Sequence, residues 1–235
     1  MFEKITEYLK SNSEPNRVKK LNKYFKVEKG GYGYGDVFIG VRAQYLRSIS
    51  KQYYKSIRLD DLSKLISSKI HEYRLTGVFL LVLKFEKEKS ESERKILVDF
   101  YLDHIKFMNN WDLIDSSAHK ILGVYLLDKD PKLLYDFAYS DNLWLQRVSI
   151  ISTFHFIRME QYKDTFEIAK ILIHHEHDLI HKAVGWMIRE VGNRDFDIAF
   201  EFIKNHYAKM SRTMLRYAIE KYPERTRQDL LKGRI

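Results

Sequence analysis

Apolar residues recur every three or four positions along most of the chain, the spacing of helices that bury one face. The connections between these segments are short, and 235 residues include only three prolines and ten glycines, so strand-and-turn signals are few. We therefore predict an all-α fold. The expected helices cover roughly residues 2–10, 16–26, 42–54, 59–67, 70–88, 92–106, 110–127, 131–139, 142–159, 162–173, 178–191, 196–206 and 211–222.

Weak internal repetition favours a helical solenoid over a bundle. Residues 144–148 align with 179–183 and then with 214–217, a period of about 35 residues that is typical of paired-helix HEAT repeats. The sequence thus predicts one domain over residues 1–235, an α-α superhelix (solenoid) of HEAT-like repeats with a concave face. One basic residue stands at the matching place of each inner helix: Arg74, Arg147, Lys182 and Arg216. Each alone would be read as a solvated side chain, but four in register predict a concave basic face that follows a phosphate backbone.

The charge balance changes the expected class of partner. Lysine and arginine together number 41 against 32 acidic residues, a net charge of +9, which favours a polyanion over a neutral metabolite. There is no cysteine, the first residues are charged rather than apolar, and no apolar run has the roughly 20 residues that span a bilayer. We expect a cytoplasmic monomer without a membrane, metal or cofactor partner. A basic protein with no nucleic-acid partner is the alternative.

One stretch, residues 109–119, places a tryptophan and a carboxylate where folding does not require them. Asn110 is a good N-cap, so Trp111 begins a helix and Asp115 lies four residues later on the same flank. Asp112, in the first turn, is interpreted as a helix-capping acid. For Asp115 a structural ion pair and a functional carboxylate both remain open. The buried stripe of this helix is expected to be Leu113, Ile114, Ser117, Ala118 and Ile121.

Other candidate motifs carry less. The glycine-rich residues 30–36 lack the Lys-Ser/Thr of a phosphate-binding loop, so nucleotide binding is not expected there. His174, His175 and His177 are interpreted as a loop between two helices rather than a zinc site. Periodicity alone places Trp144 and Trp186 in the core.

Taken together, three motifs resemble those of the DNA alkylation repair (AlkD-like) glycosylases, which are built from HEAT-like repeats. They are Asn-Trp-Asp-Leu-Ile-Asp at 110–115, Asp-Asn-Leu-Trp-Leu-Gln-Arg at 141–147 and Lys-Ala-Val-Gly-Trp-Met-Ile-Arg-Glu at 182–190. The glycine-rich loop leading into residues 35–42 also looks like a form of this family. The resemblance covers most of the chain, in the expected order.

The resemblance implies a site and an activity. Asp115 would be the catalytic carboxylate, Trp111 and Trp186 the sugar-facing indoles, Arg147 a phosphate-contacting arginine and Tyr24 the matching N-terminal tyrosine. The substrate would be double-stranded DNA containing purines alkylated at N3 or N7, and the product an abasic site, reached without swinging the base into a pocket.

Two alternatives stay open at the level of the sequence. Some relatives keep the scaffold, lack the catalytic residues and bind branched DNA, so a non-catalytic binder of branched or damaged DNA is one. The other is a HEAT-type protein–protein scaffold, which would explain the repeats without DNA.

Overall fold

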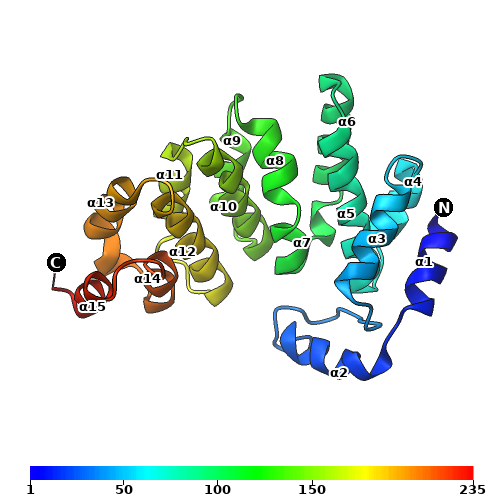
Figure 1. Ribbon diagram of the computed structural model, residues 1–235, viewed down its shortest axis with the longest axis horizontal. Coiled ribbons are helices and arrows are strands. Elements are labelled where there is room, and N and C mark those ends of the chain that lie inside the picture. Colours follow the sequence, from blue (N-terminus) through cyan, green and yellow to red (C-terminus); the bar gives the residue numbers. More distant parts are fainter. Residues whose placement is uncertain (235) are drawn as a thin grey trace. The chain divides into compact units, whose positions relative to one another are not determined.

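The computed structural model describes residues 1–234, which form α-helices and two short 3₁₀ helices joined by turns and loops (Figure 1). Within these residues the strand-like pairing is limited to an isolated parallel bridge between Val37 and Ile70. The predicted all-α helical-repeat fold is therefore confirmed. Backbone contacts divide the chain into two compact units, Met1–Ser117 and Ala118–Ile235. The assignment of a single domain stays a prediction.

The first unit is centred on one long helix. Its elements are α1 (Phe2–Ser11), α2 (Pro15–Tyr24), α3 (Ala43–Tyr53), α4 (Leu59–Ile66), α5 (His71–Lys87), α6 (Glu91–Asp103), η1 (Ile105–Phe107) and α7 (Trp111–Asp115). Helix α5 packs against α1, α3, α4, α6 and α7, and it is buried on nearly every side. Helix α2, by contrast, contains no buried residue and is followed by the buried Phe25. The core of the unit is thus built around α5, and the basic helix α2 is more exposed.

The second unit is a series of paired helices. Its elements are α8 (Ala118–Leu126), α9 (Lys132–Ala138), α10 (Leu143–Arg158), α11 (Lys163–Leu172), α12 (Asp178–Gly192), α13 (Phe196–His206), η2 (Tyr207–Lys209), α14 (Arg212–Ala218) and α15 (Glu224–Lys232). Helix α10 packs against α8, α9, α11 and α12, and α12 in turn packs against α11, α13 and α14. Gly185 makes the α12–α14 crossing close, because a Cβ atom there would lie 2.4 Å from the Met214 carbonyl oxygen.

The predicted repeat is seen at the N-termini of α10, α12 and α14, the inner helices of the repeats. Helices α10, α12 and α14 each begin after a side chain that accepts a backbone N–H bond of the first turn, as an N-cap does. These caps are Asn142, His177 and Ser211. The aligned segments 144–148, 179–183 and 214–217 therefore occupy equivalent places on successive inner helices.

One helix prediction is wrong, and one helix was not predicted. The helix expected over residues 110–127 is two helices, because the chain turns at Ser116 and Ser117. The Ser117 hydroxyl donates to the Leu113 carbonyl oxygen at 2.7 Å, a side-chain bond of the kind that competes with the helical ladder. Helix α15 was missed because it is strongly polar, although its Leu230 is 1% exposed. Among residues 1–234 no helix combines the length and apolar character needed to cross a membrane.

Candidate functional site

Helix α7 begins at a fully buried cap. The Asn110 side-chain oxygen accepts the Trp111 backbone N–H at 2.9 Å, and its Nδ2 donates to Asp36 at 3.0 Å. Leu113 and Ile114 are completely buried, and the rest of the predicted stripe, Ser117, Ala118 and Ile121, is buried as well. Trp111 and Asp115 are half-buried, so one short helix presents an indole and a carboxylate beside a fixed apolar face.

Trp111 lies in an aromatic cluster with Tyr24, the last residue of α2, and with Phe25, which follows it. Its ring stacks on Phe25 with centroids 5.4 Å apart and planes 15° apart, and the Tyr24 ring meets it edge-on at 5.8 Å. The Tyr24 side chain is 61% exposed. The structure therefore brings together two of the residues predicted for the site, Tyr24 and Trp111, in an arrangement that leaves the tyrosine accessible.

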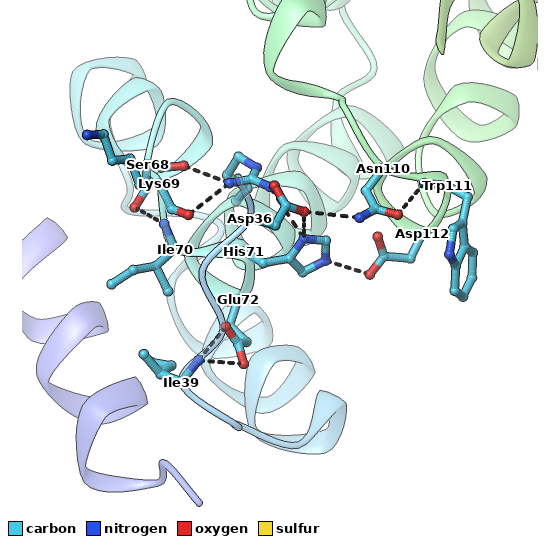
Figure 2. Close-up of polar contacts among 11 residues, drawn as sticks. Asp36, Ile39, Ser68, Lys69, Ile70, His71, Glu72, Asn110, Trp111 and Asp112 are labelled. Atoms are coloured by element: carbon cyan, nitrogen blue, oxygen red, sulfur yellow. Dashed lines mark hydrogen bonds and ion pairs between the residues drawn. The ribbon is translucent and has the colours of Figure 1, made fainter. Parts of the chain in front are cut away.

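A buried charged network supports the start of α7 (Figure 2). His71 Nδ1 lies 2.9 Å from an Asp36 carboxylate oxygen, and His71 Nε2 lies 2.8 Å from Asp112. Arg74 donates to the other Asp36 oxygen at 2.6 Å. Asp112 lies in the first turn of α7 and Asn110 is its N-cap, both as predicted. In addition, Asp112 is the ion-pair partner of a buried histidine, which the sequence did not predict.

The network keeps His71 protonated at neutral pH. Burial by itself lowers the pKa of His71, but the carboxylates of Asp112 and Asp36 outweigh it and raise that pKa to about 9. Burial raises the pKa of Asp36, yet its bonds to His71, Arg74 and Asn110 leave that pKa below its ordinary value. The cluster thus contains two cations and two carboxylates, which balance inside the unit.

Glu72, the next residue after His71, binds the backbone just after the glycine-rich residues 30–36. Its carboxylate accepts the backbone N–H groups of Ile39, Gly40 and Val41 at distances from 2.8 to 3.3 Å. At Gly33 a Cβ atom would lie 2.2 Å from the Phe25 carbonyl oxygen, so a side chain is excluded where the loop passes α2. The loop is thus part of the scaffold beneath Trp111, consistent with its lack of a phosphate-loop motif.

The predicted row of four exposed basic residues is wrong for two of its members. Arg74 is 4% exposed and donates to Asp36 and to the carbonyl oxygens of Ser68 and Lys69. Arg147 is 5% exposed and donates to the Leu179 carbonyl oxygen on α12. Both guanidinium groups satisfy buried acceptors in these positions. Both arginines were predicted from their positions in the repeat. Inner-helix positions of a repeat are also where helices pack, so repeat position alone does not show that a side chain is exposed.

Lys182 and Arg216 remain surface residues of the second unit. The Lys182 side chain is 39% exposed and forms an i,i+4 ion pair with Asp178 at 2.6 Å, while Arg216 on α14 is exposed. Trp186 is half-buried on α12 rather than in the core, and its ring centroid lies 5.7 Å from that of Phe154. Trp144 is also half-buried.

The candidate residues fall into two groups, one in each unit. The first unit holds Tyr24, Arg74, Trp111 and Asp115, and the second holds Arg147, Lys182, Trp186 and Arg216. That both groups act on one substrate stays a prediction.

The histidine segment is a loop between α11 and α12, as predicted. His175 Nδ1 accepts the His177 backbone N–H at 2.9 Å, and His177 Nδ1 accepts that of Leu179 at 3.1 Å. These ring nitrogens organise the start of α12. No group of metal-binding side chains occurs among residues 1–234.

Sequence reasoning missed Asp36 and His71 as supports of α7 and Glu72 as the support of residues 39–41. One signal was available: His71, Glu72 and Arg74 place three polar, chargeable side chains at the start of a helix that is otherwise apolar on nearly every side. Charged groups at the end of a buried helix need buried partners, and such partners cluster near functional sites.

The fold and the site together describe a class of protein. It is a basic, all-α helical-repeat protein that presents a tryptophan and a carboxylate on one short helix. Residues 5–222 match the family model described as DNA alkylation repair enzyme, so the chain belongs to that family, whose role is the repair of alkylated DNA.

Two solved structures share the fold. One, described as a predicted DNA alkylation repair enzyme from Enterococcus faecalis, has a TM-score of 0.71 at 18% identity, over 91% of this chain and 98% of that one. The other, AlkD2 from Streptococcus mutans, has a TM-score of 0.55 at 17% identity, over 89% of this chain and 98% of that one. A comparison with curated protein sequences gave no significant match.

Proposed function

We propose that the protein is a monofunctional DNA glycosylase that hydrolyses the N-glycosidic bond of purines alkylated at N3 or N7 in double-stranded DNA. The observation that carries the proposal is the placement of half-buried Trp111 and Asp115 on α7, a helix whose other face is fully buried and whose first turn is held by an internal ion network. Such support is what a preorganised site requires.

The chemistry needs few groups. Alkylation at N3 or N7 makes the purine cationic, so it leaves as a neutral base and needs little or no acid catalysis. Positive charge then develops on the deoxyribose, and an ionised carboxylate beside that sugar stabilises the oxocarbenium-like transition state and orients the attacking water. In this proposal Asp115 has both roles.

Both indoles are assigned to the sugar in this proposal, as the family resemblance implies. Indole faces carry negative potential, so Trp111 and Trp186 favour the cationic form of the sugar by the electrostatics of cation–π attraction. Tyr24, exposed beside Trp111, extends the aromatic surface on the first unit. Residues 109–119 contain no lysine that would form a Schiff base, which is why we propose base removal without strand cleavage.

Binding is assigned to surface cations rather than to the buried arginines. The net charge of +9 supports attraction to DNA, and Lys182 and Arg216 are the accessible members of the predicted basic set. Arg147, which is 5% exposed, offers a phosphate far less accessible surface than these two residues do.

The test is release of free base. Wild-type protein in excess over a duplex that carries one 7-methylguanine should liberate the base in a single turnover, leaving an alkali-labile abasic site and an intact strand. Protein that binds the duplex yet releases neither 7-methylguanine nor 3-methyladenine would favour the non-catalytic DNA binder. Absence of binding would favour the protein–protein scaffold.

A further inference from the structure

The indole of Trp186 is tied to a carboxylate one turn further along α12. Its Nε1 donates to Glu190 Oε1 at 3.1 Å, and the Glu190 side chain is only 18% exposed. A hydrogen bond to a partly buried carboxylate is stronger and better ordered than one at an open surface. The ring is therefore restrained at its polar edge.

Glu190 is itself fixed by Arg194. The Arg194 Nη1 lies 3.2 Å from Glu190 Oε2 and donates to the Glu190 carbonyl oxygen at 2.8 Å. The same guanidinium lies 6.0 Å from the centroid of the Phe154 ring, and Phe154 packs against Trp186 at 5.7 Å with the planes 50° apart. Trp186 is thus held through its N–H by Glu190 and packs against the tilted ring of Phe154, and Arg194 contacts both of these residues.

We propose that Glu190 is a positioning residue that holds the Trp186 indole in the orientation needed to contact deoxyribose, with Arg194 keeping its carboxylate in place. The inference rests on the proposed function, in which Trp186 touches the sugar. A half-buried tryptophan on a helix surface has two side-chain torsions to restrain, and packing against one aromatic neighbour leaves rotation about them possible. A hydrogen bond at the indole N–H removes that freedom.

The charge of Glu190 has a smaller role than its geometry. A carboxylate near the indole would favour a cationic sugar, but Arg194 pairs with it and largely cancels the added negative charge. Replacement by glutamine should therefore preserve the function, because the amide oxygen still accepts the indole N–H. Replacement by alanine removes the acceptor.

The experiment follows the indole and the reaction separately. The chain has three tryptophans, and the indole N–H resonance of Trp186 is assigned in ¹⁵N–¹H spectra with a Trp186→Phe variant. We expect Glu190→Ala to shift or broaden that resonance and to slow single-turnover release of 7-methylguanine by roughly tenfold, with duplex affinity nearly unchanged. Glu190→Gln should restore both the resonance and most of the rate.

Glu201→Ala is the matched control. Glu201 also accepts an i,i+4 side-chain hydrogen bond on a helix of the second unit, from Asn205 at 2.9 Å, but it lies on α13, which carries none of the proposed site residues. A folded Glu190→Ala protein with wild-type resonance and rate would overturn the inference, as would a loss of rate that glutamine does not rescue.

If Glu190→Ala does not fold, Arg194→Gln, which frees the carboxylate, should show a weaker form of the same change in resonance and rate. Wild-type behaviour of Arg194→Gln would count against the proposal. Should wild-type protein release no base, the proposed function fails, and the Trp186 resonance alone decides whether Glu190 positions the ring.

Discussion

At the scale of single residues, the two acids of α7 have different environments and therefore different expected roles. Asp112 forms an ion pair with buried His71, and Asp115 is half-buried four residues after Trp111 on the same helix. Asp115→Asn keeps the side-chain shape but removes the negative charge that balances a sugar cation. Excision should slow by roughly 10² or more, with DNA binding retained. Single-turnover release of 7-methylguanine measures the rate, and a melting curve confirms folding.

Asp112→Asn is the paired control for that prediction. It replaces the carboxylate partner of a buried histidine, so it should cost stability, about 1–3 kcal/mol, more than it costs the chemical step. The assignment of the catalytic acid would have to be reversed if Asp112→Asn, while folded, were inactive and Asp115→Asn were as fast as wild type.

His71 should make stability depend on pH. Because Asp112 and Asp36 raise its pKa from 6.5 to about 9, the folded state binds the proton more tightly than the unfolded state. The resulting stabilisation is complete below pH 6.5 and is lost as the pH rises through 9, a change on the order of 3 kcal/mol. Urea unfolding at pH 6 and pH 9.5 should show that wild type has a larger free energy of unfolding than His71→Gln, and that this difference is smaller at the higher pH. An equal difference at both pH values would mean that His71 is neutral in the folded protein.

At the scale of elements, close helix crossings fix the place of α12, the helix that carries Trp186. A methyl group at Gly185 would lie 2.4 Å from the Met214 carbonyl oxygen and 2.6 Å from the Tyr217 Cβ. Gly185→Ala should therefore push α14 away and destabilise the protein by about 1–3 kcal/mol. At Gly192, near the end of the same helix, the nearest contact is 3.3 Å from a side-chain carbon. Thermal unfolding should show a clearly smaller loss of stability for Gly192→Ala than for Gly185→Ala. Similar losses in the two variants would argue against a tight helix crossing at Gly185.

The elements that sequence reasoning found are those with strong local signals. Asn110, Asn142 and Ser211 are ordinary N-cap residues, and the helices that they begin were expected close to their observed starts. The break after Asp115 was not found, because apolar spacing continues across it and the Ser117 hydroxyl that accompanies the break gives no periodic signal. Helix α15 was missed for the opposite reason, since few of its residues are apolar.

The candidate site could be predicted only in part. Trp111 was predicted from its motif and Tyr24 only from the family resemblance, and the structure brings their rings together. The supports were missed because Asp36, His71 and Asp112 are far apart in sequence, and no local rule pairs a loop aspartate with a histidine 35 positions later. Burial of Arg74 was missed because a repeated basic residue looks the same in sequence whether it faces solvent or a buried carboxylate.

At the scale of the whole molecule, the excess of positive charge should govern DNA affinity through the release of counterions. The observed association constant should fall steeply as salt rises, with a slope set by the number of phosphates that accessible cations neutralise. Buried Arg74 and Arg147 are held by internal acceptors, so the slope should depend on surface residues such as Lys182 and Arg216. A protein–protein scaffold would show no comparable dependence.

Lys182 offers the sharpest form of this test, because the chain contains a matched lysine elsewhere in the second unit. Lys182 pairs with Asp178 at 2.6 Å and Lys132 with Asp136 at 2.7 Å, both as exposed i,i+4 pairs on helices. Lys182→Glu should weaken binding to duplexes of any sequence and reduce the salt slope by about one unit. Lys132→Glu changes the net charge equally but lies on α9, outside the predicted basic set, and should leave the slope within error of wild type. Binding titrations between 50 and 200 mM salt measure the slope for each variant. Equal changes of slope in the two variants would mean that DNA affinity depends only on total charge. An unchanged slope for Lys182→Glu would place that residue outside the DNA path.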